Sequence, residues 1–170
     1  MKGVEDLIKS YFIAKKQIPN LKLWIIGSHD EKYKKKLDFV IAGADPQSRP
    51  SLTFFNYIPE EKKNELLRRA WLLCSASLKE GFGLVTVEAA AMGAPSVVYN
   101  VDGFRDSVLN NKTGILCQEN TPENLAENIV HLIKNKELYQ KLQANALEYS
   151  RQFNFDKTTE VFENIIKKNA

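Results

Sequence analysis

The chain has 170 residues, close to the roughly 150 residues of a typical single domain and short for a two-domain enzyme. Hydrophobic residues make up 44% of it, with only 8 Gly and 6 Pro, which excludes a disordered, collagen-like or low-complexity chain. The 24 Lys and Arg nearly balance the 21 Asp and Glu, and a formal net charge of +3 is too small to indicate nucleic-acid binding. We therefore expect one compact domain, residues 1–170, with no nucleic-acid partner.

The two cysteines, Cys74 and Cys117, are far apart and lack C-x-x-C spacing, so they indicate neither a disulfide framework nor a zinc site. No stretch approaches the roughly 18 apolar residues of a membrane-spanning helix, and the N-terminal segment is amphipathic and charged. These features predict a cytoplasmic protein. Peripheral membrane contact stays open, because it requires only a basic or amphipathic patch.

Helical and extended patterns alternate along the first half of the chain. Apolar residues at three- and four-residue spacings predict a helix over residues 4–17, and the apolar run 21–26 predicts a strand that ends at Gly27. The same patterns predict helices over 31–44 and 59–70 and strands over 52–55 and 71–74. Trp24 and Trp71 lie in apolar runs and are expected in the core.

The alternation continues and then gives way to helices. We expect a helix over 84–92, a strand over 96–99, a short helix over 104–109 and a strand over 114–116. Further helices are expected over 121–134, 137–151 and 155–168. This order predicts a doubly wound, Rossmann-like α/β fold, with a parallel sheet, helices on both faces and a helical C-terminal tail.

One loop at the carboxyl end of a predicted strand carries the strongest functional signal. Gly81 and Gly83 follow a strand and directly precede a helix, where backbone amides and the helix dipole favour an anion such as a phosphate. Two carboxylates, Glu80 and Glu88, flank these glycines, and an ionised carboxylate can accept two sugar hydroxyls. By themselves these carboxylates fit equally well as a helix N-terminal charge partner (Glu80) and part of a solvated helix face (Glu88).

The segment 80–88, with its following helix ending in Gly93-Ala94-Pro95, resembles the E-x7-E segment of retaining glycosyltransferases of family 4, which have the GT-B architecture. The resemblance covers nearly the whole chain, including the segments 2–3, 55–58, 102–104 and 113–116. It implies that the chain is the C-terminal, nucleotide-sugar-binding half of such an enzyme. Its substrate is then a UDP-, GDP- or ADP-sugar, with no cofactor and no metal.

The resemblance also implies a role for each matching residue. Glu80 would be the catalytic residue that contacts donor-sugar hydroxyls, Glu88 would hold the ribose hydroxyls, and Lys2 would neutralise the diphosphate. The remaining substrate-binding positions are the loop residues Gly81, Phe82, Gly83 and Leu84, and the base-lining residues Tyr57 and Ile58.

Two loops depart from the family pattern. The family's Gly-Gly-x-x-Glu turn reads Asp102-Gly103-Phe104-Arg105-Asp106 here, so contacts to the donor sugar at this turn are not implied, and Arg105 is either substrate-facing or a surface residue. His29 stands where the family often has a second glycine and is expected to be a loop residue rather than a base.

The family's C-terminal domain begins with a central strand and an arginine that are both missing before Lys2, as is the N-terminal acceptor domain. We expect a gap between the strand of Leu23 and that of Leu72, unless these neighbours pair or borrow a strand, and no activity from the isolated chain. A non-catalytic nucleotide-binding or interaction module with the same fold is the alternative.

A basic face for an anionic membrane is a further hypothesis, and solvated helix faces are the ordinary explanation of such runs. The residues concerned are Lys32, Lys34, Lys35, Lys36, Lys62, Lys63, Arg68 and Arg69.

Overall fold

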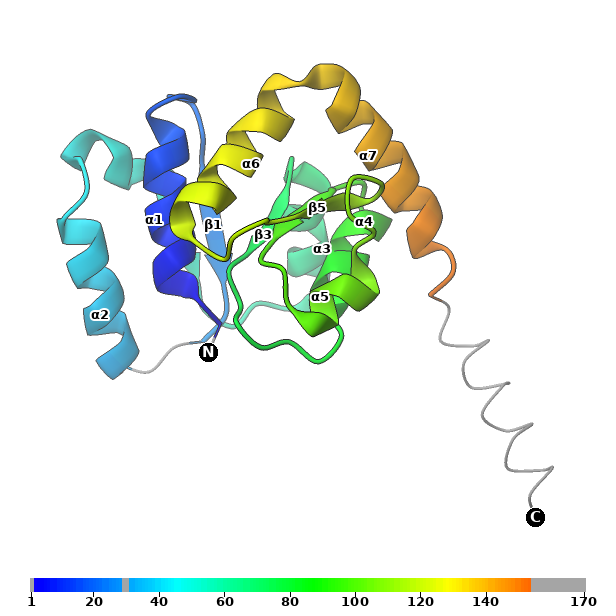
Figure 1. Cartoon of the computed structure of the whole chain (residues 1–170). Coiled ribbons are helices and arrows are strands. Elements are labelled where there is room, and N and C mark those ends of the chain that lie inside the picture. Colours follow the sequence, from blue (N-terminus) through cyan, green and yellow to red (C-terminus); the bar gives the residue numbers. More distant parts are fainter. Residues whose placement is uncertain (1, 29–30, 154–170) are drawn as a thin grey trace, which may run out of the picture.

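The computed structural model describes residues 2–28 and 31–153 (Figure 1). Its strands are β1 (Leu23–Ile26), β2 (Leu52–Phe55), β3 (Leu73–Ser75), β4 (Ser96–Val98) and β5 (Gly114–Leu116). Its α-helices are α1 (Val4–Lys15), α2 (Glu31–Ala42), α3 (Glu60–Arg69), α4 (Leu84–Ala91), α5 (Asp102–Ser107), α6 (Pro122–Lys134) and α7 (Lys136–Ser150).

The alternation expected from the sequence is confirmed, with element ends that differ by a few residues. The short helix expected over 104–109 begins earlier, as α5 at Asp102. A 3-10 helix, η1 (Pro46–Ser51), occupies a segment for which no element was predicted, and the Asp45 side chain caps it by accepting from the amide of Gln47. The predicted helix over 155–168 and the loop residue His29 lie outside the described residues.

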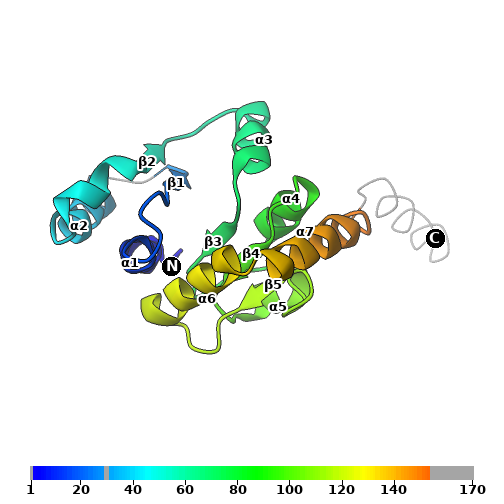
Figure 2. The same ribbon diagram turned by 90° about the horizontal axis from the view of Figure 1, so that it is seen from above.

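The described strands form two parallel sheets, β1-β2 and β3-β4-β5. Between β1 and β3 lies a groove of about 560 Å³, lined mainly by apolar residues of these strands and of α1, α3 and α6. Viewed from above, the β1-β2 pair stands apart from the other strands (Figure 2). The gap expected between the strands of Leu23 and Leu72 is therefore present, and the two strands neither pair nor merge into one sheet.

Helices cover both faces of the three-stranded sheet, because alternate side chains of each strand point in opposite directions. Val97 packs into the main core with residues of α1, α6 and α7. Its neighbour Val98 packs on the other face against Phe104 of α5, and Ala89 of α4 packs with Leu67 of α3. The Rossmann-like α/β class is confirmed, with α6 and α7 as the helical C-terminal region.

The expectation that Trp71 is a core residue is wrong. Its side chain is 62% exposed and precedes β3, with its ring 5.6 Å from that of Tyr139. Trp24 is half-buried in β1, with the Arg69 guanidinium over its ring. Both tryptophans line the groove between β1 and β3, so the open groove leaves them without the neighbour that would bury them.

None of the helices in the described part of the chain is long and apolar enough to cross a membrane.

Candidate functional site

The glycine-rich loop after β3 is shaped by the backbone of Gly83. This residue is the N-cap of α4 and has a φ of 80°, in the left-handed region that favours glycine. A Cβ atom there would lie 2.7 Å from Ser107 Oγ and 2.8 Å from a ring carbon of Phe104. Gly83 therefore allows both the turn into α4 and the close packing of α5. The Thr86 amide donates to the Gly83 carbonyl oxygen at 2.8 Å, and the amides before it, at the start of α4, lack intrahelical acceptors.

A second close backbone approach lies just before this turn. A Cβ atom on Gly103, at the start of α5, would lie 2.4 Å from the carbonyl oxygen of Glu80. Gly103 is the glycine that this turn shares with the family pattern, and its missing side chain lets α5 pack directly against the backbone of the loop.

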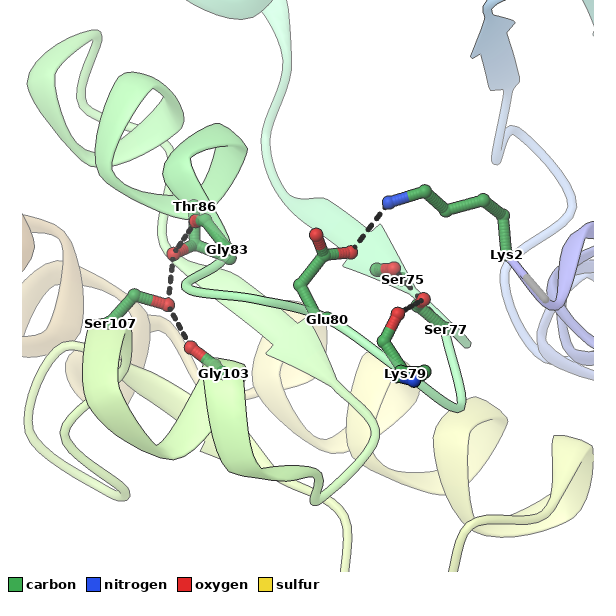
Figure 3. Close-up of polar contacts among 9 residues, drawn as sticks. All are labelled: Lys2, Ser75, Ser77, Lys79, Glu80, Gly83, Thr86, Gly103 and Ser107. Carbon is green, nitrogen blue, oxygen red and sulfur yellow. Dashed lines mark hydrogen bonds and ion pairs between the residues drawn. The ribbon is translucent and has the colours of Figure 1, made fainter.

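Buried hydroxyl groups hold the two helices at this loop together (Figure 3). Thr86 Oγ1 lies 2.8 Å from the carbonyl oxygen of Gly83 and 2.9 Å from Ser107 Oγ. The Ser107 hydroxyl in turn donates to the carbonyl oxygen of Gly103 at 3.2 Å. Sequence reasoning did not identify Thr86 or Ser107, because a small hydroxyl residue inside a helix gives no sign of its partner.

Glu80 and Lys2 meet although they are far apart in sequence. Lys2 Nζ donates to Glu80 Oε2 at 2.8 Å, and Figure 3 shows the two side chains pointing toward one another. The Glu80 side chain is 18% exposed and that of Lys2 is 72% exposed. On the strand side of Glu80, the Ser77 hydroxyl donates to the carbonyl oxygen of Lys79 at 3.0 Å, which fixes the path of the loop. The structure thus brings together a predicted catalytic carboxylate and a predicted diphosphate-binding cation.

Glu88 lies on α4, about one turn after the glycine loop, and it is held by Lys63, which the sequence pattern placed only in a possible basic face. Lys63 Nζ lies 2.9 Å from Glu88 Oε2 and 2.9 Å from Glu60 Oε1. Burial by itself lowers the pKa of Lys63, but its hydrogen bonds to Glu60 and Glu88 outweigh burial and raise the pKa above its ordinary value. Lys63 is therefore a bridging ammonium between α3 and α4, where the sequence pattern suggested only part of a basic surface.

The remaining predicted binding residues surround this loop at different levels of exposure. Gly81 has open space around its Cα, and Leu84, in the first turn of α4, is 55% exposed. The half-buried Phe82 packs its ring 5.6 Å from that of Phe153. Tyr57, which is 86% exposed, and the half-buried Ile58 lie between α3 and β2, a strand of the two-stranded sheet.

The turn after β4, which departs from the family pattern, is held by contacts within itself. Arg105 pairs with Asp102 and donates to Asn100 Oδ1 at 3.0 Å. Its guanidinium is therefore bound within the turn in this structure. The described residues contain no group of three or more His, Cys, Asp or Glu arranged to hold a metal ion.

Comparison with known proteins by sequence finds glycosyltransferases. The family model described as glycosyl transferases group 1 matches residues 1–149. Poly(glycerol-phosphate) alpha-glucosyltransferase of Bacillus subtilis is 30% identical over 90% of this chain and 22% of its own length. An uncharacterized glycosyltransferase of Methanocaldococcus jannaschii is 33% identical over 92% of this chain and 42% of its own. The chain thus spans less than half the length of these relatives.

Solved structures agree on the fold. The C-terminal domain of LpcC, a glycosyl transferase group 1 family protein from Francisella tularensis, has a TM-score of 0.77 at 22% identity, over 86% of this chain and 76% of that one. A TarM variant from S. aureus, in complex with fondaparinux, alpha-GlcNAc-glycerol and UDP, has a TM-score of 0.82 at 24% identity, over 96% and 32%. Anabaena HepE, in complex with UDP and glucose, has a TM-score of 0.81 at 20% identity, over 95% and 44%.

These matches agree with the Rossmann-like fold described above. The chain belongs to the glycosyl transferases group 1 family, and its fold is that of the C-terminal half of GT-B glycosyltransferases.

Proposed function

We propose that this chain is the donor-binding part of a retaining glycosyltransferase, which moves the glycosyl group of a UDP-, GDP- or ADP-sugar to an acceptor hydroxyl. The observation that carries the proposal is the 2.8 Å contact between Lys2 and Glu80 beside the glycine loop that opens α4. A cation, a carboxylate and a helix N-terminus are the groups that a sugar diphosphate needs, because its two phosphates are anionic and its sugar presents hydroxyls.

In the proposed reaction, the bond between the anomeric carbon and the diphosphate oxygen breaks, and the electron pair leaves with the nucleoside diphosphate. The acceptor oxygen bonds to the anomeric carbon and gives its proton to the oxygen of the departing diphosphate. Lys2 and the amides at Phe82, Gly83 and Leu84, with Gly81 keeping the approach open, stabilise the charge of the leaving diphosphate. The Glu80 carboxylate orients sugar hydroxyls and stabilises positive charge on the sugar. No metal is required in this scheme.

The nucleoside is held by the two elements that flank the loop. Glu88 accepts from the ribose hydroxyls, and Tyr57 with Ile58 lines the base. The exposure of Tyr57 supports this role, since an aromatic ring that is 86% exposed has surface available for a base.

We also propose that the groove between β1 and β3 receives the strand that precedes Lys2 in a longer polypeptide, which also carries the acceptor domain. Gly3 supports this proposal: a Cβ atom there would lie 1.8 Å from the carbonyl oxygen of Ala76, directly after β3. The chain therefore enters α1 at the carboxyl end of the groove, which is where a strand parallel to β1 and β3 would deliver it.

Titration with UDP-glucose, GDP-mannose and ADP-glucose tests the function. The longer polypeptide is expected to bind at least one of them and to transfer its sugar, and Glu80→Ala and Glu88→Ala are expected to abolish most transfer. The 170 residues by themselves are expected to bind weakly and to transfer nothing measurable. Binding without transfer by the longer polypeptide favours a non-catalytic module, and robust turnover by the isolated chain contradicts the requirement for a second domain.

We further propose peripheral contact with an anionic membrane through α2. Lys32, Lys35 and Lys36 are exposed on this helix, and Phe39 is 82% exposed beside them, a combination of cations and an aromatic ring suited to an anionic surface. Co-sedimentation with phosphatidylglycerol vesicles, but not with phosphatidylcholine vesicles, is the expected result. Unchanged sedimentation of a Phe39→Ser/Lys35→Gln/Lys36→Gln variant contradicts it.

A further inference from the structure

Lys63 connects two parts of the proposed donor site that lie on different sheets. It belongs to α3, which follows the predicted base-lining residues Tyr57 and Ile58 at the end of β2. Its ammonium reaches Glu88 on α4, the helix that follows the β3 loop, at 2.9 Å. Because β2 and β3 belong to separate sheets, this ion pair ties the base-lining side of the site to the ribose-binding side.

The contact also restricts the Glu88 carboxylate. A glutamate on a helix surface samples several rotamers, and a charged hydrogen bond to a side chain that is only 23% exposed selects among them. Within residues 2–28 and 31–153, the carboxylate contacts the Lys63 ammonium through Oε2. Oε1 is therefore the oxygen available to accept from a ligand hydroxyl. Glu60 accepts from the same ammonium at 2.9 Å and holds it from the other side.

Resting on the proposed function, we propose that Lys63 is a positioning residue, which holds Glu88 by Oε2 so that Oε1 meets the ribose hydroxyls of a bound nucleoside diphosphate. Lys63 acts through Glu88 and does not touch the ligand. Its loss therefore weakens binding only of ligands that carry those hydroxyls, whereas an ammonium that acted on the phosphates would affect every diphosphate alike.

The test compares two probes, UDP and 2′,3′-dideoxy-UDP, titrated into the 170-residue chain by NMR. Wild type is expected to prefer UDP. Lys63→Met, which keeps the aliphatic stem, is expected to lower the affinity for UDP about ten-fold. The affinity for dideoxy-UDP should stay unchanged, so that the preference for UDP is lost. Lys63→Arg is expected to restore part of it. The matched control is Lys62→Met, which removes the same charge from the neighbouring residue, whose ammonium pairs with Glu65 at 2.7 Å. It should change both affinities equally and slightly.

Coupling to Glu88 provides the second readout. Lys63→Met is expected to have no further effect on UDP binding in a Glu88→Gln background. An unchanged preference for UDP in Lys63→Met, an equal weakening of both probes, or additive effects in the double variant each overturn the inference while the proposed function stands. Wild type that binds none of UDP, GDP and ADP overturns the proposed function itself and this inference with it. Where GDP or ADP binds in place of UDP, that nucleotide and its 2′,3′-dideoxy form are the two probes. Equal binding of the ribose and dideoxy forms by wild type overturns the inference.

Discussion

Lys2 Nζ and Glu80 Oε2 lie 2.8 Å apart, and this contact joins the first described residue of the chain to the loop after β3. With Lys2 72% exposed, the pair is largely solvated, and such pairs typically contribute about 0–1 kcal/mol to folding. Its significance lies in the chemistry of the two groups at this loop rather than in stability.

Glu80→Gln is therefore expected to separate stability from activity. The melting temperature should change by no more than a few degrees, whereas glycosyl transfer by the longer polypeptide should fall about 10²-fold, because an amide cannot stabilise positive charge on the sugar. Thermal unfolding and initial transfer rates measure the two effects. Glu61→Gln, at an exposed position of α3, is the control. Equal transfer rates for the Glu80 variant and this control would remove Glu80 from the mechanism.

The two glycines of the loop are expected to differ in how much stability an alanine substitution costs. Gly83→Ala forces a left-handed φ of 80° on alanine and places its Cβ 2.7 Å from Ser107 Oγ, so we expect a loss of about 2–4 kcal/mol in the free energy of unfolding. Gly81→Ala meets nothing within 4 Å and should cost less than about 0.5 kcal/mol. Urea unfolding of both variants measures the difference, and similar costs would show that the turn is not shaped as described.

The hydroxyl group of Thr86 is expected to stabilise the junction of α4 and α5. Thr86→Val keeps the shape but removes the polar atom that contacts Gly83 and Ser107, which should cost about 1–3 kcal/mol. Thr86→Ser keeps the hydroxyl and should recover most of that loss. Chemical denaturation distinguishes the two, and a valine variant as stable as wild type would contradict a role for the hydroxyl.

Stability is expected to fall as the solution becomes alkaline. Burial raises the pKa of Cys74 to about 12, with the charge of Cys117 adding to the shift. Burial likewise raises the pKa of Cys117 to about 11, although a hydrogen bond from Asn128 opposes it. An unfolded thiol has a pKa of about 8.5, so between there and about 11 the folded chain keeps protons that the unfolded chain loses.

Urea unfolding at pH 7.5 and pH 10 measures this effect. The stabilisation present at pH 7.5 should decline toward pH 10, and the decline should be smaller in Cys74→Ala. Native thiols should also resist iodoacetamide at pH 7.5, since the thiolate is the reactive form. A free energy of unfolding that is equal at the two pH values would contradict thiol burial as the cause.

Much of the fold could be predicted from local patterns. The strand over 52–55 is found at the same residues as β2, because a short apolar run bounded by loop residues carries its own signal. Thr121 and Pro122 similarly marked the start of α6, where the Thr121 side chain accepts from the amide of Asn124. The η1 segment was missed because six residues without an apolar residue carry no hydrophobic periodicity.

Trp71 shows the limit of such patterns. Its apolar neighbours predicted a buried strand residue, but its burial depends on what occupies the groove between β1 and β3, and that is not a local property. The candidate site likewise has residues that local sequence can reveal and contacts that it cannot. Glu80 and Gly83 of the loop and Glu88 of α4 could be found because they stand at fixed spacing in one segment, and their functional roles stay predictions.

The length and the alternating apolar pattern of the sequence determined the α/β class, the parallel strands and the loop that opens α4, because each depends on residues close together in the chain. Only the tertiary structure decided that Lys2 lies against Glu80 and that Lys63 lies between Glu60 and Glu88. Those contacts join residues up to 78 positions apart. They depend on how the helices pack on two separate sheets, and an exposed lysine looks the same in a sequence whether it faces water or a carboxylate.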